Sequence, residues 1–386
     1  ASSDFSQAEA HAVGLETLEG ALVPGDYDLG YFLGGFFDGL SGVAQAPCDL
    51  AARTVALTKG SALANGFVQL SQDLSELRET IWQETANVAD EVNGLLVTLR
   101  NTQSQLIASG SASGASNAIL DARDQTISEI ATLVGVAVSS TASGAATVTL
   151  GRSGNGPVLG SATQTGSLQV QQSDDRLVFL AGQSPGLAET QQVSSGRLAG
   201  LSEAYGAVNK AMQALDALAS RLAAEFNEVH ANGIDLNGKV GGALFTADGV
   251  AVSQSATNLG RFTATATAPE VIDQVAAETR FSYSAARRAW MSFDATGKAT
   301  MHNPGPITIG PVRIDISGTP ADGDEFTLRA EIGKAAQMRF LIDKPQELAA
   351  AGLLLSQADI TNTSDTTLEA AAVAPLGATG LTDVTK

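Results

Sequence analysis

The chain has 386 residues, enough for two or three domains of about 150 residues each. It carries 41 acidic and 22 basic residues, a formal net charge of −19, and so acidic a surface repels the phosphate backbone of nucleic acids. One cysteine excludes a disulfide framework or thiolate cluster, and three scattered histidines argue against a multi-histidine metal site. No apolar run approaches the ~20 residues of a membrane-spanning helix, and residues 1–4 do not start a signal peptide. We therefore expect neither nucleic-acid nor membrane binding.

The amino-terminal part is expected to be helical. Residues 5–22 form a first predicted helix, and a second follows at residues 32–40, where Phe32, Phe36 and Leu40 are spaced for one helical face.

A long repeat then runs from Leu63 to Leu106. Its apolar residues recur at steps of three, four or seven: Leu63, Phe67, Leu70, Leu74, Leu77, Ile81, Val88, Val92, Leu95, Leu99 and Leu106. The stretch contains no proline, so the repeat predicts one long helix with a single narrow apolar seam. A shorter helix is predicted at 117–134, with Asn117 or Ser116 as its N-cap.

The pattern changes to period two between 136 and 180. Short strands are expected at 136–138, 147–150, 168–170 and 177–180, separated by glycine-rich turns.

A second long helix is predicted from 201 to 229. Its seam residues are Leu201, Tyr205, Val208, Met212, Leu215, Ala219, Leu222, Phe226 and Val229. Narrow seams on long helices indicate rods that lie side by side. We expect Leu70, Leu77, Val92 and Leu99 to face Leu201, Val208, Leu215 and Leu222. Burial of each side chain should stabilise the pair of helices by about 1.5–3 kcal/mol.

Strands dominate again after residue 233. They are expected at 261–268, 280–284, 289–293, 312–317 and 326–330, followed by a short helix at 345–356. The fold class is therefore predicted as α+β: an elongated helical rod domain with a small β insertion, plus a mainly-β outer domain. The predicted bounds are 1–137 with 196–233 for the rod, 138–195 for the insertion, 234–355 for the outer domain, and 356–386 for a return segment or tail.

The motifs that could carry chemistry are weak. Ser184 stands in a G-x-S-x-G pattern, but Pro185-Gly186 predicts a turn where a nucleophile elbow needs a helix. Asp235-Leu-Asn-Gly238 begins like a calcium loop, yet Thr246 occupies the position of the required glutamate. We instead expect Gly233 to cap the long helix and Asn237-Gly238 to form a tight turn. No catalytic residue, cofactor or metal ligand is predicted.

Several ordered segments carry a family resemblance. Phe32–Leu40 followed by Ala46–Arg53 resembles a Phe-Phe helix and an "NPSDPAAR" turn, with Cys48 and Leu50 in place of Ser and Pro. Leu63–Phe67 is similar to the start of a rod helix, and Leu120–Gln125 with Leu133–Val136 resembles "LLDQRDQ…LVGV". Together these segments resemble the hook-associated protein 1 (FlgK) family, which joins hook and filament in the bacterial flagellum.

Two downstream turns extend the resemblance. Phe226-Asn227 with 233–245 resembles the family's "FN…GxDLNGxxGxxFF", and Ile316–Phe326 is close to "VSGTPAxGDxF". The residues matched in the turns are Gly233, Asp235, Asn237, Gly238, Gly318, Pro320, Gly323 and Asp324.

The resemblance implies a structural protein rather than an enzyme. It implies a ring of copies that contacts the hook protein and the second junction protein, outside the cell, after export without a cleaved signal peptide. The family's terminal segments, an "N-x-x-N-x-x-T-x-G-Y" motif and a final heptad helix, have no counterpart here. This chain therefore resembles a trimmed piece, which we expect to be monomeric.

Three alternatives stay open at this point. Flagellin and the second junction protein share helical rods, although the two downstream turns favour the first junction protein. A surface adhesin would need a ligand groove lined by aromatic residues such as Tyr283, Trp290 and Phe293. An enzyme would depend on Ser184 alone.

Overall fold

The computed structural model describes residues 2–23, 28–108, 117–140, 145–173, 176–183, 186–255, 257–267, 278–293, 298–302, 305–310, 312–331 and 333–352. Ser116, Ser184 and the predicted tail 356–386 lie outside the described residues. The chain forms two compact units, Ala1–Gly25 with Leu70–Ala214 and Asp26–Gln69 with Leu215–Lys386. We call them unit 1 and unit 2.

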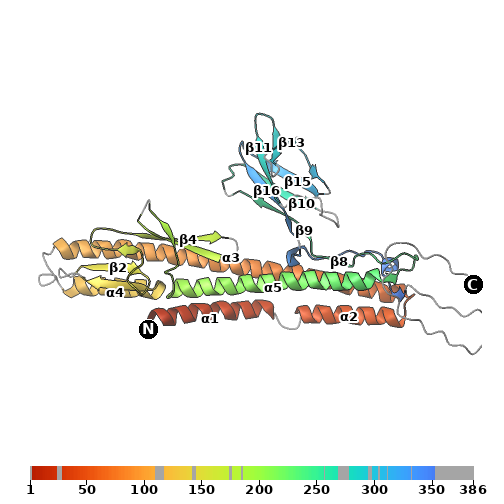
Figure 1. Ribbon diagram of the computed structural model, residues 1–386, viewed down its shortest axis with the longest axis horizontal. Helices are drawn as coiled ribbons and strands as arrows, with labels where there is room; N and C mark the ends of the chain where they lie inside the picture. The colour runs from red at the N-terminus through yellow and green to blue at the C-terminus, as the bar shows by residue number, and fades with distance from the viewer. Residues whose placement is uncertain are drawn as a thin grey trace, which may run out of the picture. The chain divides into compact units, whose positions relative to one another are not determined.

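Five α-helices are present in the described part: α1 Ser2–Leu22, α2 Leu29–Gln45, α3 Leu50–Ala108, α4 Asn117–Leu133 and α5 Arg197–Ala231 (Figure 1). Each long predicted helix is therefore a single element. Helix α3 begins at Leu50 rather than Leu63 because the Asp49 side chain accepts the N–H of Ala51 at 2.8 Å, an N-cap bond. None of the described helices has an apolar stretch suited to crossing a bilayer.

In unit 1, α3 and α5 run antiparallel. The Arg78 side chain bonds Asn209 at 3.4 Å, and Arg197 pairs with Glu84 at 2.7 Å, so the two contacts proceed in opposite directions along the helices. Helix α1 runs parallel to α5 and approaches it closely through glycine: a Cβ added to Gly14 would lie 2.4 Å from that of Ala204. These contacts pack three helices of unit 1 together.

The buried stripe of α3 departs from the predicted seam at single positions. The seam expected at Leu95 is shifted to Leu96, which is 0 % exposed, whereas Leu95 is half-buried. Near its start the helix is buried on a wider face that includes Ala56, Leu57 and Leu63. The stripe returns to the predicted seam at Leu99 and Leu106, which are both buried.

Two small three-stranded sheets cover part of α3 in unit 1. Their orders are β1-β2-β3 and β4-β5-β6, with bounds Val136–Ser140, Ala146–Leu150, Val158–Gly160, Ser167–Ser173, Arg176–Gly182 and Ala188–Thr190. The Asn93 side chain bonds both the N–H and the carbonyl of Leu168, at 2.8 and 2.9 Å, and thereby fixes β4 on α3. The sequence predicted four of these strands; β3 and β6, of three residues each, were missed.

Unit 2 contains a two-sheet domain that we call the β-sandwich. Its five-stranded sheet has the order β13-β12-β11-β16-β9, and its three-stranded sheet has the order β10-β15-β14. The strands are β9 Gly249–Gln254, β10 Arg261–Thr267, β11 Glu278–Ser284, β12 Ala289–Phe293, β13 Ala299–His302, β14 Ile307–Ile309, β15 Val312–Thr319 and β16 Glu325–Glu331.

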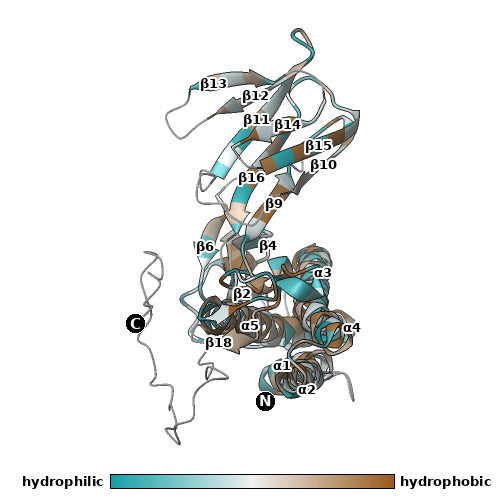
Figure 2. Cartoon of the chain, turned by 90° about the vertical axis from the view of Figure 1, so that its right-hand side faces the viewer, coloured by the Kyte–Doolittle hydropathy of each residue, from teal (hydrophilic) through white to brown (hydrophobic). Residues whose placement is uncertain are grey.

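The core of the β-sandwich lies between its two sheets. It includes Phe262, Phe281, Trp290, Ile314 and Phe326, all at most 7 % exposed. Hydrophobic and hydrophilic residues alternate along β15 and β16 (Figure 2), as expected for strands with one buried face. The five strands predicted here are present, while β9, β13 and β14 were missed.

Two short ribbons connect the β-sandwich with the helices of unit 2. Strand β7 (Gly233–Ile234) pairs with β18 (Ala351–Gly352), and β8 (Phe245–Thr246) pairs with β17 (Arg339–Phe340). Two single 3₁₀ turns, Ala335–Gln337 and Pro345–Glu347, complete the unit.

The helix predicted at 345–356 is wrong. Only the 3₁₀ turn forms, Leu348 is extended, and β18 follows, while residues 353–356 lie outside the described part. The physical reason is that a side chain of α3, that of Arg53, takes up the carbonyls of Pro345 and Leu348, which a helix would need.

Candidate functional site: helix seam, return strap and signature turns

The predicted seam residues differ in burial. Val92, Leu99 and Val208 are 0 % exposed, and Leu201 and Leu215 are also buried. Leu70, Leu77 and Leu222 are half-buried and border the stripe. On α3 the neighbouring seam residues Phe67 and Leu74 are buried, and so is Ser71, which was not predicted in the seam.

An aromatic cluster joins α2, the end of α5 and both strands of the β8–β17 ribbon. Phe36, which is fully buried, contacts the rings of Phe226, Phe245 and Phe340 at centroid distances of 5.1, 5.5 and 6.1 Å. Edge-on geometry of this kind adds about 0.5–1.5 kcal/mol to each pair. The cluster fixes the entry and exit of the β-sandwich on the helices of unit 2.

Arg53 is the largest fully buried side chain described, at 1 % exposed. Its guanidinium donates to the carbonyls of Pro47 at 2.6 Å, Pro345 at 3.1 Å and Leu348 at 2.5 Å. Burial lowers the pKa of Arg53 from its usual value, and the charge of Asp235 acts against this. The arginine holds residues 345–352, which we call the return strap, against α3.

His230, the last buried residue of α5, also bonds the return strap. Its Nε2 accepts the N–H of Ala349 at 2.7 Å, which leaves Nδ1 to carry the proton and donate to the carbonyl of Gly242 at 2.7 Å. Burial lowers the pKa of His230, opposed by the Gly242 bond and by Asp235. The two bonds therefore select the neutral imidazole.

The first signature turn follows α5. Asp235 accepts the N–H groups of Asn237 and Lys239, both at 2.8 Å, and the bond from Lys239 is the main reason that the pKa of Asp235 is lowered. Gly238 has φ +76°, so the tight turn at Asn237-Gly238 is present. The expected cap at Gly233 is wrong: this residue stands two positions after the end of α5 at Ala231, but it lacks the positive φ of a capping glycine and pairs with Gly352 as part of β7.

The second signature turn joins β15 to β16. Asp324, 2 % exposed, accepts N–H groups from Leu259 at 2.8 Å, Gly260 at 3.0 Å and Ala321 at 2.7 Å. Burial alone would raise the pKa of Asp324, but these donors outweigh it and the pKa is lowered. The carboxylate thus ties the turn to the loop that precedes β10.

The backbone of this turn requires glycine at two positions. Gly318 has φ +95°, and a Cβ there would lie 2.3 Å from the carbonyl oxygen of Arg261. Gly323 has φ +83° and donates its N–H to the carbonyl of Tyr283 at 2.9 Å. Pro320, between them, is half-buried.

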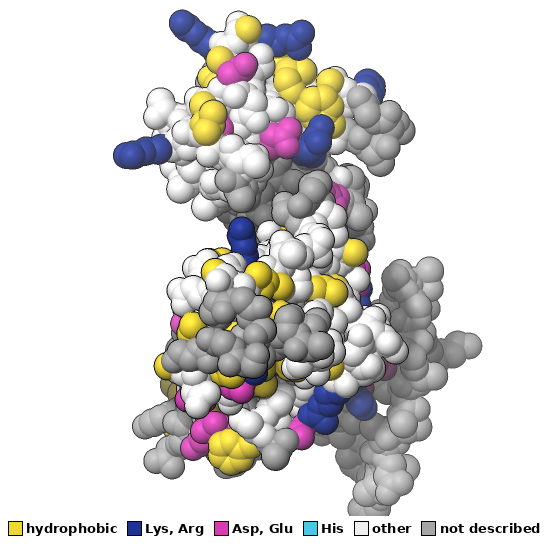
Figure 3. Space-filling view, turned by 90° about the vertical axis from the view of Figure 1, so that its left-hand side faces the viewer, with side chains coloured by type: hydrophobic (Ala, Val, Ile, Leu, Met, Phe, Trp, Pro, Cys, Tyr) yellow, Lys and Arg dark blue, Asp and Glu magenta, His cyan; other side chains and the backbone are white. Residues whose placement is uncertain are grey.

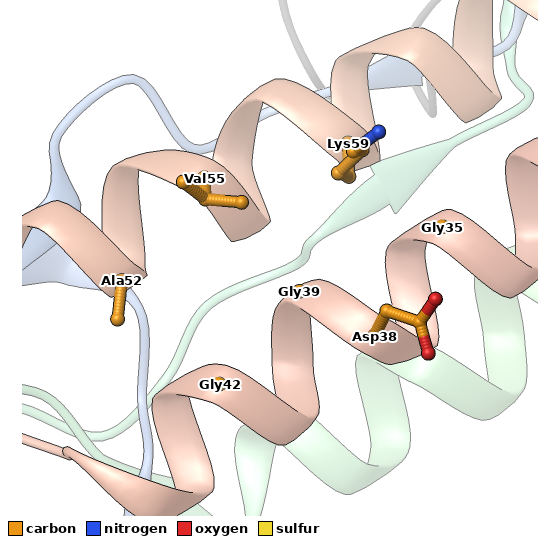
Figure 4. A pocket seen from close by; sticks show the side chains of 7 residues that line it. All are labelled: Gly35, Asp38, Gly39, Gly42, Ala52, Val55 and Lys59. Atoms are coloured by element: carbon orange, nitrogen blue, oxygen red, sulfur yellow. The ribbon is translucent and has the colours of Figure 1, made fainter.

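A shallow groove of about 350 Å³ lies between α2 and α3 in unit 2 (Figure 4). Its floor is formed by small residues, among them Gly39 and Ala52, and Asp38 and Lys59 are its charged side chains. This lining offers no nucleophile with a neighbouring base. Among the described residues, no three His, Cys, Asp or Glu side chains gather as a metal site would require.

The aromatic residues considered for an adhesin do not line a groove together. Trp290 is 3 % exposed and packs against Phe262 and Phe326 at centroid distances of 5.1 and 4.9 Å, in the core of the β-sandwich. Tyr283 packs on Trp290, and Phe293 lies under the guanidinium of Arg280.

Sequence reasoning missed three of the residues that hold this site together: Arg53, Asn227 and His230. Asn227 accepts the N–H groups of Leu244 and Phe245 at 2.7 and 2.9 Å, which starts the β8–β17 ribbon. Arg53 and Asn227 stand within the motifs that carried the family resemblance, and this position in the motifs was the feature of the sequence that could have pointed to them. His230, a single histidine at a helix end, offered none.

These features define a class of protein, a structural scaffold: two long helices, small sheets inserted between them, and a β-sandwich that follows the second helix and is bonded at its connections. The family model of the flagellar hook-associated protein FlgK helical domain matches residues 15–245, more than half of the chain. The chain belongs to the FlgK family.

Similar proteins agree with this assignment. Flagellar hook-associated protein 1 of Escherichia coli (strain K12) is 26 % identical over 327 residues, 82 % of this chain and 59 % of the relative. That of Bacillus subtilis (strain 168) is 26 % identical over 304 residues, 72 % of this chain and 59 % of the relative. The chain thus spans about three fifths of the length of these curated relatives.

A solved structure supports the fold. The flagellar hook junction protein FlgK from Burkholderia pseudomallei matches with a TM-score of 0.59 and 24 % identity, covering 90 % of this chain and 64 % of that one. The α+β fold class predicted from the sequence is confirmed.

Proposed function

We propose that this chain is part of a structural component of the bacterial flagellum that forms the junction between hook and filament. The observation that carries the proposal is that the FlgK helical-domain match, residues 15–245, contains both long helices completely. The relatives it resembles are named as hook-associated and hook junction proteins. Its role would be mechanical: to hold neighbouring subunits in place without catalysing a reaction.

The rod function is assigned to residues 1–137 with 196–233, with the β insertion at 138–195, the outer β domain at 234–355 and a return segment or tail at 356–386. Stiffness would come from the seam, because buried apolar side chains such as Val92, Leu99 and Val208 resist separation of the helices. The return strap would keep the outer domain fixed at its base through Arg53 and His230.

The partners would be other copies of the same protein in a ring, the hook protein and the second junction protein. The protein would act outside the cell, in the flagellum, after export without a cleaved signal peptide. The 386-residue chain alone would be monomeric in dilute solution, since a single contact between two copies is weak and a ring combines many such contacts at once.

Deletion of the chromosomal gene tests the proposal. Cells should build hooks that carry no filament and release filament subunits into the medium, and the wild-type gene on a plasmid should restore filaments. Electron microscopy of isolated hooks gives the result. A deletion strain that keeps filaments in normal number would refute the proposal.

A further inference from the structure

Acidic and basic residues are distributed unequally along the chain. Residues 1–248 contain 26 acidic and 11 basic side chains, whereas residues 249–331 contain 9 acidic and 7 basic ones. The β-sandwich is therefore much less acidic than the rest. Basic side chains project from its upper end in Figure 3.

Two of these cations stand together at the tip of the β11–β12 hairpin. Arg287 and Arg288 occupy the turn between Ser284 and Ala289, and both are exposed. Among the residues that the structure describes, neither guanidinium is paired with a carboxylate; Arg287 lies 3.7 Å from the sulfur of Met291. We call Arg287 and Arg288 the basic tip.

The backbone of the basic tip is unusual. Arg288 has φ +50°, the one positive φ found outside glycine in the described part of the chain. This left-handed conformation favours glycine or asparagine, and a long side chain there costs free energy. The hairpin turn accounts for this conformation, because the N–H of Arg288, the last residue of the loop, donates to the carbonyl of Ala285 at 3.3 Å.

The second signature turn supports the basic tip through hydrogen bonds to the residues that precede it. The Asp322 carboxylate accepts the N–H of Ala285 at 2.7 Å, and the N–H of Gly323 donates to the carbonyl of Tyr283 at 2.9 Å. Asp324 in turn is fixed by three backbone donors. The two guanidinium groups are thus presented on a supported hairpin, which lowers the ordering cost of a contact.

We propose that the basic tip docks on the acidic surface of a second copy of this chain, formed by residues 1–248. Charge complementarity supports this partner, because that region has a net charge of 11 − 26 = −15 and the tip adds two exposed cations. Helix α1 is one suitable surface: it carries Glu9, Glu16 and Glu19 and no lysine or arginine, while its Asp4 is paired with Arg152. The inference rests on the proposed function, in which copies stand side by side.

Cross-linking between copies tests the contact. The full chain with Arg287→Lys and Arg288→Lys keeps both charges and gains amines that a carbodiimide couples to carboxylates. Labelled and unlabelled chains are mixed at high concentration and low salt, where a weak contact between copies is populated. Mass spectrometry then separates links between copies from links within one. We expect mixed-isotope links from positions 287 and 288 to acidic residues of 1–248, weakened by high salt. Lys210, exposed on α5, is the internal comparison.

Two further variants separate charge from folding. Arg288→Gly suits the positive φ and removes one cation. Combined with Arg287→Lys, it should fold at least as well, yet lower the yield of links between copies from the amine at position 287. Arg287→Glu with Arg288→Glu, introduced into the chromosomal gene, should weaken filament attachment about tenfold or more, whereas Arg261→Glu, an exposed arginine elsewhere on the sandwich, should not.

The outcomes are distinguishable. Links from positions 287 and 288 that stay within one copy, or that form no more often than those of Lys210, would overturn the inference. Normal filaments in the Arg287→Glu, Arg288→Glu strain would do the same, provided that the deletion strain lacks filaments. If the deletion strain itself keeps filaments, the proposed junction function fails instead.

Discussion

The seam of α3 offers a matched pair of substitutions five residues apart. Val92 is 0 % exposed and Val97 is 51 % exposed, and both are valines in the same helix and the same unit. Val92→Ala removes two buried carbon groups, which costs about 1.6 kcal/mol of transfer free energy at about 0.8 kcal/mol each. The cavity left behind raises the loss to about 2–3 kcal/mol. Val97→Ala should change the free energy of unfolding by no more than about 0.5 kcal/mol.

Urea unfolding followed by far-ultraviolet circular dichroism measures both variants, because the helices dominate that signal. The midpoint should fall for Val92→Ala and stay near that of the wild type for Val97→Ala, with slopes unchanged. Equal losses in the two variants would show that the seam does not stabilise the helices, and the account of the rod would have to be given up.

Three other predictions concern the turns and the strap. Asp324→Ala leaves the N–H groups of Leu259, Gly260 and Ala321 unpaired, at about 1–3 kcal/mol each. Thermal unfolding followed by Trp290 fluorescence, in a Trp82→Phe background because the chain has two tryptophans, should therefore move to lower temperature. Asp315→Ala, at the exposed surface, should leave the unfolding temperature unchanged. Gly318→Val should destabilise the β-sandwich by about 2 kcal/mol or more, because the new side chain would sit at a positive φ and clash with the carbonyl of Arg261. Gly20→Ala, whose added methyl group meets open space, should stabilise α1 by up to about 1 kcal/mol in hydrogen-exchange measurements. Because burial lowers the pKa of His230, the unfolded chain binds a proton more readily than the folded one below about pH 6.5, so stability should fall as pH drops from about 7 to 5. Burial lowers the pKa of His302 in the same way, so the contributions of the two histidines are separated by measuring the unfolding temperature against pH for His230→Gln and for His302→Gln. A pH dependence that is unchanged in His230→Gln would contradict the assignment of this effect to His230.

Local patterns predicted the helices well because their signal is strong and repeated. The apolar repeat from Leu63 to Leu106 and that from Leu201 to Val229 each fall within one helix, α3 and α5. The strands β3 and β6, with three residues each, carry no such repetition. Strand β3 forms where α3 offers partners far away in sequence, Leu96 and Leu99 beside Gly160, and β6 forms by pairing with β5.

The connections at the base of the β-sandwich could not be predicted either, because they too depend on contacts between residues far apart in the sequence. A short apolar stretch at 345–356 favours a helix locally, but Arg53, almost 300 residues earlier, bonds the carbonyls of Pro345 and Leu348. The turn at Asn237-Gly238, by contrast, depends on adjacent residues and was predicted. Contacts between distant residues, rather than local preference, decide the site.

The paired ribbons below the β-sandwich have an evolutionary consequence. The N–H of Lys334 donates to the carbonyl of Ala247 at 2.7 Å, so the chain enters and leaves the sandwich at nearly the same point. Everything between those two residues is an insertion whose ends already meet. Such a module can be lengthened, exchanged or removed while the helices keep their register, which lets the exposed part of the molecule diversify independently of the scaffold that carries it.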